Sequence, residues 1–392
     1  MTLINLSGRI DSNNAGIVES EISSQLTENP GETPAFDAEN LTYISSAGLR
    51  VLLKVSKNYR AKLDVLNVCD EVYNIFDVTG FTELFNVRKK LREISIDGLE
   101  IIGSGGFSTV YRLDSETVIK VFNKNSAGFE GAERDRTASR EVFIHGIPTA
   151  IAYDTVKAGE YYGLVYEMID ADTLAAAVSK HPERLEELSA KSAHLLRKLH
   201  ATEFEPGTFR DGREKLREMI QKPCDMGLIT PDDREFLDGI IDRIPSRNTF
   251  IHMDYHPKNI MVSGDDLILI DVGGAGLGDP IIDLLISYSF FFGRCFEVDD
   301  NVRKFHEKNM GLTAQTLGAM WNIIMQKYFG TSDKNILSRY CEAIKEYSPL
   351  FMFYIMMFDK TNPDHDDRRE KAAEIMRHLR EISGTLKTIE GI

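Results

Sequence analysis

The stretch HMDYHPKN at residues 252–259 decides the fold, together with the apolar run LILI at 267–270 and the DVG that follows at 271–273. It places an Asp five residues before an Asn, and then a second Asp at the end of a predicted strand. The first carboxylate can take a proton from a hydroxyl, while the Asn and the second Asp can hold Mg²⁺ against phosphate groups. Phosphoryl transfer depends mainly on positioning and charge neutralisation, so the stretch predicts a phosphotransferase site.

A glycine-rich turn lies upstream. Residues 101–111, IIGSGGFSTVY, predict a strand, a tight turn and a second strand. Glycines in such a turn let backbone N–H groups approach a phosphate closely. The turn taken alone also fits an ordinary hairpin. The expected nucleotide contacts in it are Gly103, Gly105, Gly106 and Ser108.

A lysine follows within a β-branched strand. Lys120 lies in TVIKVF at 117–122, where kinases carry the lysine that pairs with the α- and β-phosphates. Taken alone, Lys120 also fits an edge lysine that reaches toward solvent, and Asp254 fits a polar loop. The glycine-rich turn, the lysine and the Asp–Asn stretch occur together in the order found in kinases. This order favours a single phosphotransferase site over separate structural explanations for each piece.

Residues 96–392 resemble the aminoglycoside/choline kinase-like branch of the kinase superfamily, and GIPTA at 146–150 is typical of that branch. The resemblance implies a two-lobed α+β fold, with a small lobe at about 96–167 and a helical lobe at about 168–392. It also implies ATP and Mg²⁺ as cofactors. The implied roles are Asp254 as catalytic base, Lys120 as phosphate lysine, Asn259 and Asp271 as magnesium ligands, His252 as a brace of the catalytic loop and Asp283 as a structural residue.

The acid that pairs with Lys120 is expected on a helix between residues 129 and 145. Asp135 is the best-placed candidate, although this branch usually carries a Glu, and Glu133 and Glu141 are the alternatives. The strand at 162–169 is expected to lead into the hinge, where backbone groups of Glu167 and Met168 would meet an adenine edge. A simple core strand fits that stretch equally well.

The first 88 residues predict a separate small α/β domain, because strand and helix patterns alternate. Strands are expected at 5–11, 35–38, 41–44 and 61–68, and helices at 14–26, from 46 and at 71–78.

This domain resembles the STAS fold of anti-sigma-factor antagonists through ISSAGL at 44–49 and VTGF at 78–81. The resemblance implies a protein partner and places the regulatory phosphorylation site on Ser46, with Ser45 as the other candidate. Ser45 stands where the family has Asp, and Ala47 where it has a second Ser. A serine at a helix start is also an ordinary N-cap.

Composition excludes several classes. The net charge of −15 and the pI near 5.2 argue against nucleic-acid binding. The four cysteines are widely spaced, so neither zinc nor a disulfide framework is expected. We expect a cytoplasmic protein without membrane spans, because no signal segment or run of about 18 apolar residues occurs.

The remaining organisation follows from charge and apolar patterning. Residues 88–93, RKKLRE, predict a short, stiff connection between the domains. Helices are expected at 317–328, 336–347, 349–358 and 369–386.

Three functions fit the sequence. The first is an ATP- and Mg²⁺-dependent phosphotransferase for a small hydroxylated molecule, with a regulatory STAS domain. The second is a signalling Ser/Thr kinase that acts on Ser46 or Ser45, or on another STAS protein. The third is a non-catalytic nucleotide sensor, which the intact set of Lys120, Asp254, Asn259 and Asp271 disfavours.

Overall fold

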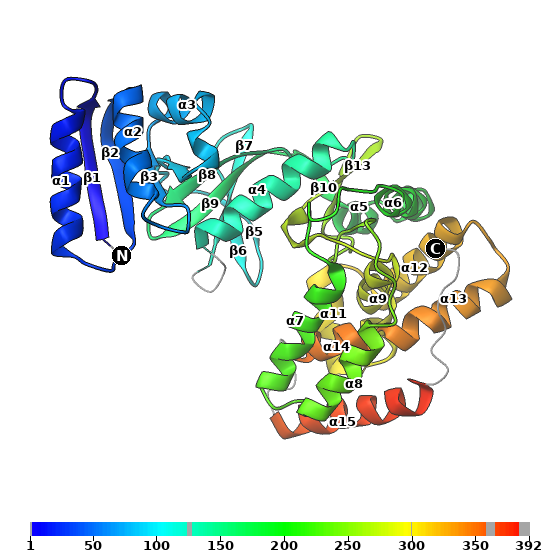
Figure 1. Ribbon diagram of the computed structural model, residues 1–392. Coiled ribbons are helices and arrows are strands. Elements are labelled where there is room, and N and C mark those ends of the chain that lie inside the picture. Colours follow the sequence, from blue (N-terminus) through cyan, green and yellow to red (C-terminus); the bar gives the residue numbers. More distant parts are fainter. Residues whose placement is uncertain (1, 124–127, 299, 358–364, 384–392) are drawn as a thin grey trace. The chain divides into compact units, whose positions relative to one another are not determined.

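The computed structural model describes residues 2–123, 128–298, 300–357 and 365–383. The chain forms two compact units, and each is treated separately below (Figure 1). One comprises Met1–Ser95 and Val156–Glu160, and the other comprises Ile96–Thr155 and Tyr161–Ile392.

The N-terminal unit is a parallel sheet flanked by helices (Figure 1). Neighbouring strands in the order β1-β2-β3-β4 all run parallel, which requires a crossover between each pair. The alternation in the sequence predicted this α/β architecture, and it is confirmed. Its elements are β1 (Thr2–Ile10), α1 (Ala15–Glu28), β2 (Pro34–Ile44), α2 (Ser46–Ser56), β3 (Asp64–Val68), α3 (Asp70–Val78), η1 (Phe81–Glu83) and β4 (Asn86–Lys89).

Two details of this unit differ from the sequence prediction. The separate strands expected at 35–38 and 41–44 form the single strand β2, which stays paired with β1 through two register shifts. The domain was also expected to end at residue 88, within β4, whereas the compact unit continues to Ser95. Strand β4 carries Arg88 and Lys89 on the edge of the sheet, where charge is common, and this charge made it resemble a linker.

Helix α2 packs closely on the sheet because its third residue is a glycine. A Cβ atom at Gly48 would lie 2.7 Å from side-chain carbons of both Ile10 and Ile44. The ISSAGL motif therefore requires glycine at this position for close helix–strand packing.

The small lobe is a five-stranded sheet in the order β5-β6-β7-β9-β8, with helix α4 alongside (Figure 1), and all of it except residues 156–160 belongs to the second unit. The first three strands are antiparallel neighbours, and β7 also pairs with β9. The elements are β5 (Ile101–Ser104), β6 (Ser108–Arg112), β7 (Thr117–Phe122), α4 (Gly128–Ile144), β8 (Ala152–Ala158) and β9 (Tyr161–Glu167).

The larger lobe is helical around a core that includes Trp321 and Phe291. Its helices are α5 (Leu174–Lys180), η2 (Pro182–Arg184), α6 (Leu185–His200), α7 (Gly212–Asp225), α8 (Pro231–Ile241), η3 (Val272–Gly274), α9 (Ile281–Tyr288), η4 (Ser289–Gly293), α10 (Arg294–Phe296), α11 (Asp300–Met310), α12 (Ala314–Phe329), α13 (Lys334–Tyr347), α14 (Pro349–Met356) and α15 (His365–Ile382). Its short strands are β10 (Asp172–Thr173), β11 (Phe250–Ile251), β12 (Ile260–Ser263), β13 (Asp266–Leu269) and β14 (Gly276–Leu277).

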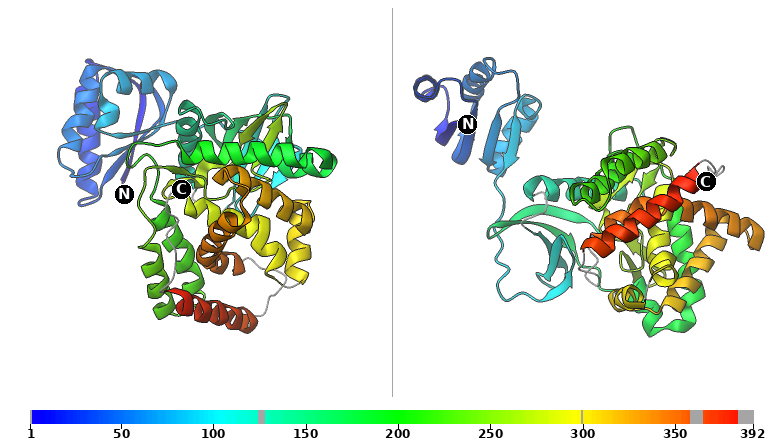
Figure 2. Two further views of the ribbon diagram at one scale, coloured as in Figure 1. Left: turned by 90° about the vertical axis from the view of Figure 1, so that its right-hand side faces the viewer. Right: turned by 90° about the horizontal axis from the view of Figure 1, so that it is seen from below.

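The four helices expected late in the chain correspond to α12–α15. Residues 358 and 384–386 of those predictions lie outside the described residues. Helix α15 begins at His365, four residues earlier than expected, and carries Asp366 and Asp367 in its first turn, where the helix dipole favours acids. It lies beside α8 and α14 (Figure 2), and Arg380 pairs with Asp233 at 2.7 Å.

All four cysteines are free thiols. Within the described ranges, no helix is both long and apolar enough to cross a membrane.

Candidate active site

Lys120 joins two carboxylates from distant parts of the second unit. Its Nζ lies 2.8 Å from Oδ2 of Asp135 on α4 and 2.7 Å from Oδ1 of Asp271, which follows β13. The side chains of Lys120 and Asp135 are only 13% and 11% exposed, whereas that of Asp271 is 48% exposed. The lysine therefore holds α4 and the strand end together while one carboxylate faces solvent.

Lys120 and Asp271 stabilise each other's charged forms. Burial by itself would lower the pKa of Lys120, but the charges of Asp271 and Asp135 outweigh it and raise the pKa above its ordinary value. Partial burial of the half-exposed Asp271 carboxylate likewise opposes its ionisation, yet Lys120 holds the pKa of Asp271 below its usual range. Lys120 is thus a permanent cation, and Asp271 a permanent anion, at neutral pH.

Of the three acids considered for Lys120, the structure places Asp135 against it and the two glutamates elsewhere. Glu133 pairs with Arg136 at 2.7 Å and accepts a hydrogen bond from the Thr155 hydroxyl. Successive helix residues are turned by about 100°, so residues 133 and 135 face nearly opposite ways. Helix α4 lies close enough to β7 for the short Asp side chain to reach.

Gly273 makes this arrangement possible. A Cβ atom at Gly273 would lie 1.7 Å from Oδ1 of Asp135 and 2.1 Å from its Cγ. Any larger residue would displace the carboxylate that Lys120 binds. The sequence contained this glycine in DVG at 271–273, but nothing local indicated its contact with Asp135.

Asp254 and Asn259 form a second pair. The Asn259 Nδ2 donates to Oδ2 of Asp254 at 2.9 Å and to the Asp254 backbone carbonyl at 3.0 Å. The Asp254 side chain is 43% exposed, and its Oδ1 lies 3.5 Å from Nε2 of His256. The amide therefore fixes one carboxylate oxygen and leaves the other accessible, as a proton acceptor requires.

His252 braces this loop from inside. Its Nδ1 accepts the backbone N–H of Asp254 at 3.2 Å, so its Nε2–H donates to the carbonyl oxygen of Ile270 at 3.1 Å. Ile270 directly precedes Asp271. One buried imidazole thus links the loop of Asp254 to the strand end that presents Asp271.

Asp283 holds the same loop by its backbone. Its carboxylate accepts N–H bonds from His252 at 2.7 Å and from Met253 at 2.6 Å, and Met253 has a φ of 63°. Two residues that the sequence did not indicate complete the network: His200 Nε2 lies 3.2 Å from Asp283, and the Tyr328 hydroxyl lies 2.7 Å from His200 Nδ1. The left-handed backbone at Met253 is thereby stabilised by a fully buried carboxylate.

The glycine-rich turn connects β5 and β6. The Gly105 N–H donates to the carbonyl of Ser108 at 2.9 Å, which closes the turn. A Cβ atom at Gly106 would meet nothing within 4 Å. The packing of the turn therefore does not require this glycine, which fits a role in letting a ligand approach the backbone.

At the strand end expected to contact adenine, two backbone N–H groups already form hydrogen bonds within the protein. The Glu167 N–H donates to Ile151 O at 3.0 Å, and the Met168 N–H donates to Glu116 O at 2.7 Å. An adenine edge at these two residues would therefore have to be met by carbonyl oxygens.

Asn259 and Asp271 are the residues that could hold a Mg²⁺ ion. Because the Asn259 amide nitrogen is committed to Asp254, its amide oxygen is available to a cation. Asp271 uses Oδ1 for Lys120, and among the described residues its Oδ2 has no hydrogen-bond partner. A carboxylate and an amide oxygen are hard ligands that suit Mg²⁺ completed by phosphates and water.

In the N-terminal unit, Ser45 and Ser46 differ in environment. The Ser45 hydroxyl caps α2 by accepting the Ala47 N–H at 3.2 Å. Ser46 is the first residue of α2 and is exposed. Of the two candidates, Ser46 is the more accessible.

Comparison with known proteins identifies both parts of the chain. Residues 99–309 match the phosphotransferase enzyme family (APH), and residues 1–94 match the STAS domain family. The chain belongs to the phosphotransferase enzyme family, preceded by a STAS domain. A putative anti-sigma factor antagonist, BtrV of Bordetella bronchiseptica, is 36% identical over 90 residues, which cover 22% of this chain and 77% of BtrV.

Solved structures that are similar to part of this chain include ADP-bound aminoglycoside phosphotransferase APH(2'')-Ib. It is 15% identical, and the alignment covers 73% of this chain and 94% of that one with a TM-score of 0.48. A choline/ethanolamine kinase family protein from Mesorhizobium loti is 18% identical over 73% of this chain and 89% of its own, with a TM-score of 0.46.

Proposed function

We propose that the protein is an ATP- and Mg²⁺-dependent phosphotransferase that moves the γ-phosphate to a hydroxyl group of a small molecule. The observation that carries this proposal is the convergence on Lys120 of Asp135 from α4 and Asp271 from the end of β13. Membership of the phosphotransferase family supports it. A non-catalytic nucleotide sensor would not need an accessible carboxylate such as that of Asp254.

In the proposed reaction each residue of the site has a distinct role. Lys120 contacts the phosphates as a permanent cation, and Asp135 orients it. Asn259 and Asp271 would hold Mg²⁺, which neutralises phosphate charge during transfer. Asp254 accepts the proton of the attacking hydroxyl on Oδ1, while Asn259 keeps Oδ2 in place. The backbone of the turn at 103–108 covers the phosphates.

The STAS domain is proposed to bind a protein partner and to regulate or localise the enzyme. A second candidate function is a signalling kinase that phosphorylates Ser46 in the STAS domain of this chain, or a serine of another STAS protein. Ser46 is exposed at the start of α2, where backbone N–H groups and the helix dipole favour a phosphate. Phosphorylation there would add nearly two negative charges to a docking surface.

Intact mass spectrometry after incubation with ATP and Mg²⁺ separates these candidates. The proposed function predicts an unmodified chain, and ATP consumption that rises when a panel of small amines and sugars is added. A phosphate on Ser46 that is absent in Asp254→Ala would instead support the signalling kinase. ATP binding without turnover under any condition would contradict both.

A further inference from the structure

A cavity of about 550 Å³ lies within the second unit, between α4, the segment before α7 and the residues that follow Asp271. Its walls include Arg134, Arg210, Lys215, Gly273 and Ala275. Among the described residues that line it, neither Asp254 nor Asn259 is found. The cavity is therefore separate from the pair that would receive the acceptor hydroxyl.

Three cations, Arg134, Arg210 and Lys215, line this cavity. The Lys215 ammonium donates to the carbonyl oxygens of Gly274 and Ala275, the second at 2.5 Å, which aims it at the wall formed by the segment after Asp271. Burial, with the positive charges of Arg210 and Arg134 nearby, lowers the pKa of Lys215 to about 8. Crowding of like charges is costly unless an anion relieves it.

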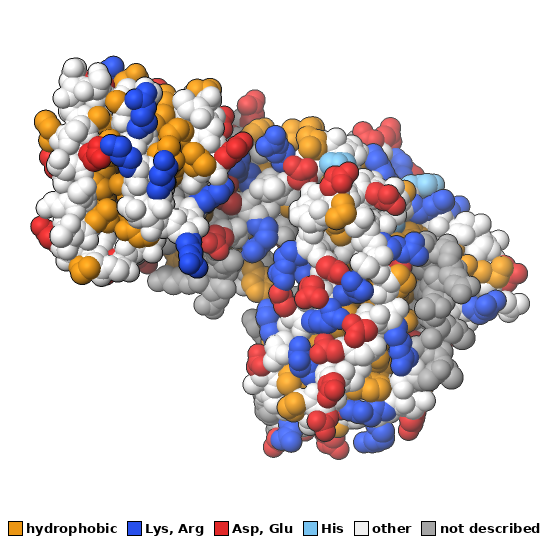
Figure 3. Space-filling model, in the orientation of Figure 1, with side chains coloured by type: hydrophobic (Ala, Val, Ile, Leu, Met, Phe, Trp, Pro, Cys, Tyr) orange, Lys and Arg blue, Asp and Glu red, His pale blue; other side chains and the backbone are white. Residues whose placement is uncertain are grey.

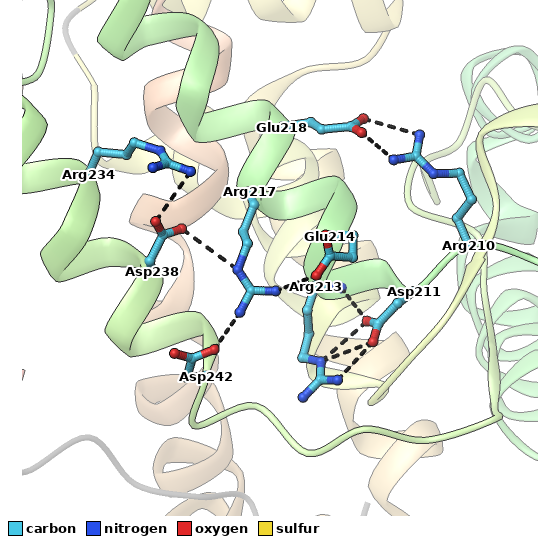
Figure 4. Close-up of polar contacts among 9 residues, drawn as sticks. All are labelled: Arg210, Asp211, Arg213, Glu214, Arg217, Glu218, Arg234, Asp238 and Asp242. Carbon is cyan, nitrogen blue, oxygen red and sulfur yellow. Dashed lines mark hydrogen bonds and ion pairs between the residues drawn. The ribbon is translucent and has the colours of Figure 1, made fainter.

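These cations contrast with the other basic residues of the region. Over α7 and α8 acidic and basic side chains alternate on the surface (Figure 3). Figure 4 shows Arg213 directed at Asp211 and Arg217 directed at Glu214 and Asp242, away from Arg210. These arginines are neutralised within the lobe.

Among the described residues, two of the three cations of the cavity lack such an ion pair. The third, Arg210, which precedes α7, pairs with Glu218 in the middle of that helix (Figure 4). In the described part of the chain, neither Arg134 nor Lys215 has a carboxylate within 4.0 Å. These two cations therefore form no direct ion pair with any described residue, and the negative charges of Glu218 and Asp135 act on Lys215 only at longer range.

The carboxylates that line the cavity do not provide that counter-ion. Glu133 is engaged by Arg136 and Thr155. Glu141 lies seven residues after Arg134 on α4, which is about 10 Å along the helix. Neither glutamate therefore forms an ion pair with Arg134 or Lys215.

We propose that this cavity binds a small phosphorylated molecule whose phosphate lies between Arg134, Arg210 and Lys215, apart from the phosphate that is transferred at Asp254. Three cationic donors that line one cavity suit the oxygens of a phosphate monoester, and the volume is typical of small-molecule sites. This goes beyond the proposed function, because the bound phosphate is not a reactant. Arg134 adjoins Asp135, and Gly273 touches both Asp135 and the cavity, so the ligand acts as an effector of the Lys120–Asp135 pair.

The site is tested by titrating the full-length protein with inorganic phosphate at neutral pH and measuring the heat of binding by calorimetry. We expect saturable binding that weakens about tenfold or more in Arg134→Gln and in Lys215→Gln. Arg213→Gln, which removes one positive charge from α7, the helix that carries Lys215, should bind phosphate as the wild type does. Lys120→Gln should also retain binding. Affinity lost only in Lys120→Gln would place the phosphate at the transfer site and overturn the proposal, as would no saturable binding.

The unmodified protein offers a second measurement that does not depend on variants. Its lysines are acetylated at pH 7.5 with and without inorganic phosphate, and each modified peptide is quantified by mass spectrometry. Phosphate should slow acetylation of Lys215 and leave Lys222, on the same helix, unaffected. Equal rates at Lys215 with and without phosphate would contradict the proposal.

Discussion

Replacing Gly273 with Ala would put a methyl group onto the Asp135 carboxylate. A Cβ atom at 273 lies 1.7 Å from Oδ1 and 2.6 Å from Oδ2 of Asp135, and real Cβ atoms essentially never approach within 3.0 Å. The carboxylate must therefore move. Because its Oδ2 accepts the 2.8 Å bond from Lys120, that bond is lost.

The expected effect follows from the burial of the pair. Both side chains are nearly enclosed, at 13% and 11% exposed, so solvent screens their interaction little. A hydrogen bond between charged groups contributes roughly 1.5–3 kcal/mol. If the bond orients Lys120 during transfer, its loss slows the reaction about ten- to hundredfold. Lys120 keeps its contact with Asp271, so transfer is slowed rather than abolished.

The assay is single-turnover loss of the labelled γ-phosphate from ATP in Mg²⁺. Gly274→Ala is the matched control, because a Cβ atom there meets nothing within 4 Å. In an Asp135→Ala background, Gly273→Ala should add little, since both changes remove the same interaction. Equal rates for the two glycine variants, or fully additive effects with Asp135→Ala, would refute the reasoning.

Three further predictions concern other residues. Asp271→Ala should weaken nucleotide affinity in Mg²⁺, and unchanged affinity in calorimetry would exclude Asp271 as a metal ligand. Burial lowers the pKa of His306 in the folded protein to about 4, from its ordinary value of 6.5. As the pH falls, this histidine therefore takes up a proton in the unfolded chain before it does so in the folded one. The folded state loses about 3 kcal/mol of stability between pH 6.5 and 4 as a result. Urea midpoints should show this loss in the wild type and a smaller one in His306→Gln. Gly48→Ala should destabilise the STAS domain by about 1–3 kcal/mol through overpacking, whereas Gly16→Ala, with open space around it, should not; equal melting curves would refute this.

The reactive residues could be predicted because their chemistry constrains both residue type and spacing. Asp254 and Asn259 stand five residues apart on one loop, so a short stretch of sequence contains the whole pair. The partner of Lys120 was harder to choose. Helix α4 has few large apolar residues, and without an apolar stripe the sequence does not indicate which face meets β7.

Two contacts between distant segments had no signal in the sequence. Asp283 is held by His200, 83 residues earlier, and the contact of Gly273 with Asp135 spans the two lobes. No local pattern records such pairs. Strand β4 was missed for a different reason, because its charged residues protect a sheet edge and so resemble a linker.

Helices α7 and α8 were not predicted, although signals for them were present. Asp211 and Thr230 cap their N-termini, and Thr230 forms a capping box with Asp233. These caps precede helices whose buried positions recur at helical spacing. The cavity beside α7 could not have been found without the structure, because its walls come from three separate segments.

The central claim is that Asp254 accepts the proton of the attacking hydroxyl. The most direct test compares γ-phosphate transfer and nucleotide affinity in the wild type and in Asp254→Ala, with melting curves as the control for folding. Transfer should fall by about 10²–10⁴-fold, while nucleotide affinity in Mg²⁺ stays unchanged, because Lys120 and Asp271 are intact. An Asp254→Ala protein that transfers phosphate at the wild-type rate would contradict the proposed mechanism.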